Sequence, residues 1–169
     1  DFVRRLTLYK LRAKVEIAQQ DQVLVAASWQ DDSASSHPDS ATSQTDSAWL
    51  KDLRFPSGVA VWRGYGAEIE ADTALADWNA WRVRHGIAES GADYVLGDAF
   101  PHDVLLDQTG GIGFRKGCYV GQEVVSRMQH RGTARRRVLL AETAAELPTP
   151  GTEITANGRA VGLLGTVTG

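Results

Sequence analysis

The sequence predicts an α+β fold whose last part is the start of a small β-barrel, and three observations support this prediction. Apolar and charged residues alternate over 11–17, and an apolar run follows at 23–27, as is typical of strands. Leu75 and Trp78 recur at helical spacing ahead of Gly86, which predicts a helix. After Arg137, strand-like runs alternate with turns.

The first half of the chain is expected to contain one short helix, three strands and one mobile loop. Phe2, Leu6 and Tyr9 recur at helical spacing, which predicts the opening helix. The third strand is expected at 59–62. Residues 30–48 are mostly Asp, Ser, Thr and Ala, which bury too little apolar surface to offset the entropy of ordering, so we expect a mobile surface loop.

The second half should contain two helices and a hairpin. Asp72 or Thr73 can cap the first helix, and Gly86 is a plausible stop. A second helix should run from about Gly121 to Arg131, after a turn-rich segment at 91–117. A strand is expected at 138–141 and a hairpin around Asn157-Gly158. We therefore divide the chain into an α+β region, 1–133, and a β-barrel portion, 134–169.

Composition narrows the function classes. The chain has 169 residues, a net charge of −3 and one cysteine, so it is not built to coat nucleic acid as a whole and forms no internal disulfide. One thiolate also cannot complete a four-ligand metal or iron–sulfur site. No apolar run approaches the ~20 residues that span a bilayer, and no signal peptide is visible. The chain starts at Asp1 and stops after a strand-like run, so we expect both ends to continue in a longer polypeptide.

The most informative segment runs from Gly110 to Arg131. Its glycines do not match a dinucleotide or phosphate-loop spacing, because Lys116 stands where a glycine is required and Gly117 follows that lysine. Cys118 lies between this lysine and the expected helix start, and both favour a thiolate. A buried, inert thiol is an equal alternative.

Two neighbours of Cys118 also have two interpretations. Tyr119 is either a core anchor or a surface on which a planar ligand stacks. Glu123 is either a simple helix-start acid or a ligand contact. The mechanistic interpretation requires that the Cys118 sulfur be accessible at the mouth of a ligand cavity.

The octapeptide Lys116-Gly117-Cys118-Tyr119-Val120-Gly121-Gln122-Glu123 resembles the signature of the YgfZ family, a folate-binding branch of the glycine-cleavage T-protein (aminomethyltransferase) superfamily. Flanking segments agree, including Phe100-Pro101-His102-Asp103, Val124-Val125-Ser126-Arg127 and the stretch 6–15. The resemblance covers nearly the whole chain and is weakest over 30–48.

This resemblance implies ferredoxin-like, T-protein-type folate-binding domains followed by a β-barrel, with an N-terminal portion absent from this chain. It implies a protein that binds tetrahydrofolate or a derivative and supports assembly or repair of iron–sulfur clusters in client enzymes, including tRNA-modifying ones. The partners would be those enzymes or cluster assembly factors. The protein would be located in the cytoplasm, or in mitochondria in a eukaryote. Lys116 and Cys118 match the family's functional lysine and cysteine. The candidate folate contacts are Tyr119, Gln122, Glu123, Asp103, Arg127 and Arg12.

One position departs from the superfamily pattern. Arg84 stands where superfamily members usually carry a glutamate that holds the pterin, and a guanidinium only donates hydrogen bonds. Either Asp103 or another acid replaces that glutamate, or pterin binding is altered.

A basic cluster leaves further functions open. It is a solvated face, a clamp for the glutamate tail of folate, or a tRNA contact. Besides the helper function, the sequence is compatible with a folate-dependent one-carbon transferase or demethylase and with a tRNA-binding module. Whether the protein is an enzyme is left open. The cluster consists of Arg127, His130, Arg131, Arg135, Arg136 and Arg137.

Overall fold

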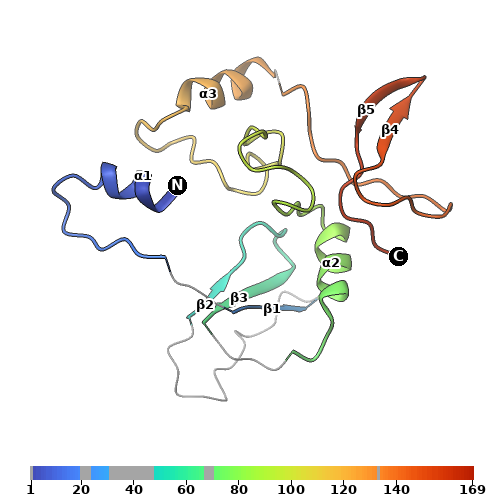
Figure 1. Cartoon of the computed structure of the whole chain (residues 1–169), viewed down its shortest axis with the longest axis horizontal. Coiled ribbons are helices and arrows are strands. Elements are labelled where there is room, and N and C mark those ends of the chain that lie inside the picture. Colours follow the sequence, from blue (N-terminus) through green and yellow to red (C-terminus); the bar gives the residue numbers. More distant parts are fainter. Residues whose placement is uncertain (1, 20–23, 31–47, 67–70, 133) are drawn as a thin grey trace.

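The computed structural model describes residues 2–19, 24–30, 48–66, 71–132 and 134–169. Figure 1 shows a small sheet with one helix beside it, a long irregular segment that leads to a second helix, and a separate hairpin near the C-terminus. The predicted mobile loop at 30–48 lies almost wholly outside the described residues. The elements are α1 (Phe2–Tyr9), β1 (Val25–Gln30), β2 (Ala48–Lys51), β3 (Ala60–Tyr65), α2 (Leu75–Arg84), α3 (Gln122–Arg131), β4 (Glu153–Ala156) and β5 (Arg159–Leu163).

The three-stranded sheet is antiparallel in the order β1-β3-β2, so β3 lies in the centre. One face of the sheet packs against α2. Trp78 and Trp81 of α2 are buried against Val61 of β3, together with Phe55 and Ile87. Their burial explains why this part of the chain holds its shape: large aromatic side chains remove much apolar area from water.

Helix α2 confirms the helix expected before Gly86, but it begins later than predicted. Its N-cap is Ala74, not Asp72 or Thr73, because the Asp77 carboxylate folds back and accepts the Ala74 N–H at 2.9 Å. The predicted stop is confirmed. Gly86 has φ 69°, a left-handed conformation that glycine adopts without strain.

Two predicted strands are absent from the structure. Residues 11–17 form no strand, because Leu11 has φ 47° and the following N–H groups bond within the segment, as Ala13 does to the Lys10 carbonyl. Residues 138–141 also form no strand. Val138 donates its N–H to the carbonyl of Asp103 instead of to a neighbouring strand. The strand-like pattern is present in both segments, but neither has a partner strand among the described residues.

The C-terminal hairpin is confirmed. Asn157 and Gly158 have φ 51° and 73° and join β4 to β5 as a two-residue turn, the geometry that an Asn-Gly pair favours. The opening helix, the strand around 59–62 and the helix that ends at Arg131 are confirmed as well. The α+β class therefore holds. The division into a folate-binding region and a barrel stays a prediction.

Candidate functional site

The octapeptide forms an exposed loop that turns into α3 at Gly121. Gly121 has φ 86°, which a residue with a side chain rarely adopts. Its carbonyl accepts the N–H groups of Val124 and Val125, and the Gln122 N–H bonds back to the Tyr119 carbonyl. Glycine is thus favoured at the point where the loop becomes a helix, and the Tyr119 carbonyl ties the loop to the first residue of that helix.

Cys118 is exposed on this loop, not buried among aliphatic side chains. Val120, two residues further on, is completely exposed. The structure therefore supports an accessible thiol rather than the inert core thiol. An exposed cysteine can act as a nucleophile or give one ligand to a metal centre whose other ligands come from elsewhere.

Lys116 is directed at the ring of Tyr119. Its ammonium lies 4.4 Å from the ring centroid, a cation–π contact. A Cβ added at Gly113 would lie 3.1 Å from the Cδ atom of Lys116, so the lysine stem crosses this glycine closely. The sequence placed Lys116 beside Cys118 as an electrostatic partner, whereas the structure shows a contact with Tyr119. Tyr119 is half-buried, so it is neither a fully buried core anchor nor a fully open stacking surface.

Four of the six candidate folate contacts lie on the loop and α3. Tyr119 precedes the helix, Gln122 and Glu123 form its first turn, and exposed Arg127 follows one turn after Glu123, on the same helix face. A carboxylate, an amide and an aromatic ring offer the acceptors, donors and flat surface that a pterin needs. Arg12 lies apart in sequence, exposed in the segment after α1.

Asp103, the sixth candidate, is already engaged within the chain. It is buried and accepts hydrogen bonds from the Phe100 N–H at 3.1 Å and from Arg136 at 3.3 Å. It ties the turn around 100–103 to the segment that leads toward the hairpin. Arg84, which stands in the place of the usual pterin-binding glutamate, is exposed in the last turn of α2.

The predicted basic cluster is partly neutralised. Arg136 pairs with Asp98 and Asp103, and Arg137 makes a two-pronged contact with Asp107 at 3.0 and 2.9 Å. The hydrogen bond from Arg137 lowers the pKa of the Asp107 carboxyl below its usual value, against a smaller opposing effect of burial. These pairs leave less positive charge for an RNA or a folate tail than the sequence indicated.

The sequence analysis gave His102 no role beyond its place in a flanking segment, and the structure shows that it contacts α3. His102 is almost fully buried, and its Nε2 lies 3.2 Å from Oε1 of Gln129 in α3. Its Nδ1 has no hydrogen-bond partner among the described residues. A histidine in a turn-rich stretch carries no periodic signal, so only the tertiary contact shows that it links the turn to the helix behind the cysteine loop.

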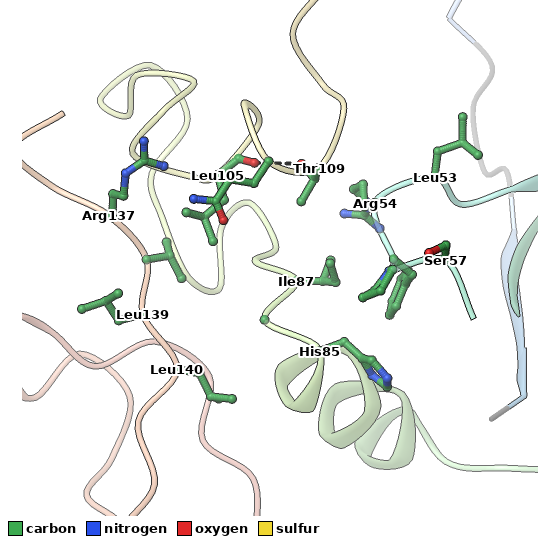
Figure 2. Close-up of a pocket in the computed structure, with 15 residues that line it drawn as sticks. Leu53, Arg54, Ser57, His85, Ile87, Leu105, Thr109, Arg137, Leu139 and Leu140 are labelled. Carbon is green, nitrogen blue, oxygen red and sulfur yellow. Dashed lines mark hydrogen bonds between the residues drawn. The ribbon is translucent and has the colours of Figure 1, made fainter. Parts of the chain in front are cut away.

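A hollow of the described chain is lined by no residue of the octapeptide, and that Cys118 lies at the mouth of a ligand cavity stays a prediction. Figure 2 shows this hollow, of about 650 Å³, between the end of α2, the segment around 53–57, the turn at 105–109 and the stretch 137–140. Of the residues singled out from the sequence as site residues or basic cluster, only Arg137 lines it. A smaller hollow of about 420 Å³ lies on the sheet beside β2 and β3.

Within the described ranges, no helix has the length and apolar character needed to cross a bilayer. No three His, Cys, Asp or Glu side chains of that part of the chain converge as a metal-binding group.

Comparisons with known proteins define the class. Residues 135–169 match the family model described as the CAF17 C-terminal β-barrel domain. Proteins named iron-sulfur cluster assembly factor IBA57 homolog, mitochondrial, are similar to the chain. The one from Chaetomium globosum is 57% identical over 58 residues, 34% of this chain and 13% of that protein.

Longer matches come from two other fungi. The relative from Neosartorya fischeri is 30% identical over 89% of this chain and 39% of its own length. The relative from Pyricularia oryzae is 34% identical over 80% of this chain and 36% of its own length. The chain thus spans less than two fifths of the curated relatives that it matches along most of its length. These relatives are members of the YgfZ family, which confirms the resemblance seen in the octapeptide.

Proposed function

We propose that this chain is part of a protein that supports iron–sulfur cluster assembly, and that Cys118 is its functional residue. The observation that carries the proposal is the exposed thiol within the octapeptide, in a chain whose relatives are named iron–sulfur cluster assembly factors. The names of those relatives also give a mitochondrial location, which we propose for this protein instead of the cytoplasmic alternative.

The geometry suggests what the thiol does. The loop holds Cys118 in solvent, where a partner protein or a cluster in transit can reach it. These residues offer one cysteine sulfur, so a cluster held there would need further ligands, from a partner protein or from other parts of the full-length polypeptide. The cation–π contact of Lys116 with Tyr119 restrains the loop that presents the thiol.

Complementation tests this function. Full-length protein carrying Cys118→Ser, expressed in a strain that lacks its own family member, should fail to restore the activity of cluster-dependent enzymes. Val120→Ser, two residues away and also exposed, is the matched control and should restore it. Full rescue by Cys118→Ser at equal expression would exclude the thiol as the functional group.

Folate binding is the second part of the proposal. A ring, an amide and a carboxylate lie within five residues at the start of α3, on Tyr119, Gln122 and Glu123. These three groups suit a pterin, which needs a flat surface and hydrogen-bond partners. Tetrahydrofolate would supply nitrogen atoms that can carry a one-carbon group. These side chains would bind the ligand and orient it. Calorimetry with tetrahydrofolate on the full-length protein should show saturable binding that Glu123→Gln weakens, while Glu146→Gln, an exposed acid near the hairpin, leaves it unchanged. Equal binding by the two variants would remove Glu123 from the site.

The clients are proposed to include tRNA-modifying enzymes that carry clusters. Loss of cluster-dependent tRNA modifications in the Cys118→Ser strain would support this. If these modifications are fully retained while other cluster-dependent enzymes lose activity, the clients do not include the tRNA-modifying enzymes.

A further inference from the structure

We infer that the hollow on the sheet beside β2 and β3 binds a small, multiply charged oxyanion, the phosphate or carboxylate group of a ligand. The hollow has a volume of about 420 Å³ and is lined by Lys51, Arg54, Arg63 and Asp52, with Leu50, Leu53 and Tyr65 around them. Three cations face one carboxylate, which leaves an excess of two positive charges in one concavity. This site lies apart in sequence from Cys118 and does not depend on the function proposed for the thiol.

The one carboxylate of the hollow organises the two arginines. Asp52 accepts hydrogen bonds from Nε and Nη2 of Arg54 at 2.9 and 2.6 Å, and from Nε of Arg63 at 2.9 Å. Its side chain is only 5% exposed. Burial disfavours its charge, but the hydrogen bonds from Arg54 and Arg63 outweigh burial and lower its pKa to about 2. Asp52 therefore stays ionised at neutral pH and holds both guanidinium groups in place before a ligand arrives.

Lys51 and Arg63 line the hollow and keep donors for a ligand. Arg63 uses Nε for Asp52, and its guanidinium carbon lies 5.3 Å from the ring centroid of Trp78, so the group is held between a carboxylate and an aromatic face. Within the described ranges, the two terminal nitrogens of Arg63 and the ammonium of Lys51 make no hydrogen bond or ion pair with another residue. A guanidinium with two parallel free donors suits a carboxylate or a phosphate.

A nearby acid does not cancel this charge. Glu89 acts on Arg54 through space, but its carboxylate is paired with Nε of Arg82 at 3.1 Å. The hollow also shares Leu53 and Arg54 with the larger hollow of Figure 2. A ligand with a charged end at Arg63 and an apolar body would thus find apolar surface beyond Leu53.

Anion titrations of the full-length protein test the site. Inorganic phosphate and succinate are titrated separately, and binding is followed by calorimetry and by the indole N–H resonance of Trp78, assigned with Trp78→Phe. Because Arg63 contacts this ring, the resonance should shift as the anion binds. If only phosphate saturates the site, the ligand carries a phosphate group, and if only succinate does, it carries a carboxylate. Saturation by both anions would show that the site recognises the oxyanion chemistry that they share.

Charge variants give the decisive comparison. Lys51→Gln should weaken anion binding roughly five-fold, the effect of one charge at about 4 Å in water, and should lower its dependence on salt. Arg84→Gln removes an exposed cation of α2 that does not line the hollow, and should change binding less than about two-fold. Cys118→Ser should bind the anion normally. No saturable binding of either anion, or equal weakening by Lys51→Gln and Arg84→Gln, would overturn the inference.

Discussion

Replacing Arg82 with methionine should destabilise the protein far more than the same replacement of an exposed arginine. Arg82 is 2% exposed in α2. It bonds Asp93 at 2.6 Å and Thr166 at 2.7 Å, and it also donates to the carbonyl of Ile87 at 3.2 Å. One side chain therefore joins the helix, the turn that follows it and the segment after the C-terminal hairpin.

The loss of stability in Arg82→Met follows from the carboxylate of Asp93, which stays buried without its ion-pair partner. Removing one partner of a buried ion pair costs about 3–5 kcal/mol, because the other charge stays buried without its partner. Asp93 keeps two backbone donors, the N–H groups of Glu89 at 2.8 Å and Thr166 at 2.7 Å. Burial disfavours the charge of Asp93, but hydrogen bonds from Thr166, Glu89 and Arg82 together lower its pKa. We therefore expect the lower end of the range, about 3 kcal/mol.

Urea denaturation followed by tryptophan fluorescence measures this loss, because Trp78 and Trp81 lie in the core on the same helix. With a slope of about 2 kcal/mol/M, the midpoint should fall by about 1.5 M. Arg84→Met is the matched control: the same substitution two residues later, at an exposed position, should change stability by less than about 0.5 kcal/mol.

A double-mutant cycle with Asp93→Asn completes the test. Because the two side chains touch, their effects should be non-additive, with a coupling of about 1–3 kcal/mol. Additive effects, or an Arg82→Met variant as stable as Arg84→Met, would show that this buried pair does not hold the C-terminal segment on α2.

Three further predictions concern other contacts. The pKa of Asp52 is about 2 in the folded state against an ordinary value of 3.8, so its contribution of about 2 kcal/mol is complete above about pH 5 and is lost as the pH falls toward 2. Urea midpoints should therefore fall less steeply toward low pH in Asp52→Asn, which keeps only the losses of other carboxyls such as Asp93, and equal slopes would contradict this. Gly64→Ala should cost about 1–3 kcal/mol in thermal unfolding, because its Cβ would lie 3.0 Å from the Trp49 ring, whereas Gly162→Ala meets open space; equal losses would contradict the packing. Arg137→Gln should cost less than about 1 kcal/mol, and less still in high salt, since its ion pair is at the surface; a loss as large as that of a buried pair would refute this.

The amino-acid sequence determined the local features of this protein. The helix stop at Gly86, the helix start at Gly121 and the hairpin turn at Asn157-Gly158 all depend on glycine in a left-handed conformation or on an Asn-Gly pair. Such conformations are set by sterics within a few residues, so they are readable without knowledge of the fold. The octapeptide is also contiguous, and its length made the family resemblance visible in one chain.

The tertiary structure decided whatever depends on a distant partner. A strand requires a neighbour, and neither 11–17 nor 138–141 has one among the described residues, although both carry the pattern. The contact of the Lys116 ammonium with the Tyr119 ring depends on how the loop folds, and the spacing of the two residues in the sequence did not indicate it. The burial of Arg82 and the gathering of Asp52 and Arg63 in one hollow join residues 11 to 84 positions apart. Charge pairing over such separations leaves no periodic trace in the sequence, because it depends on which surfaces the packed core brings face to face.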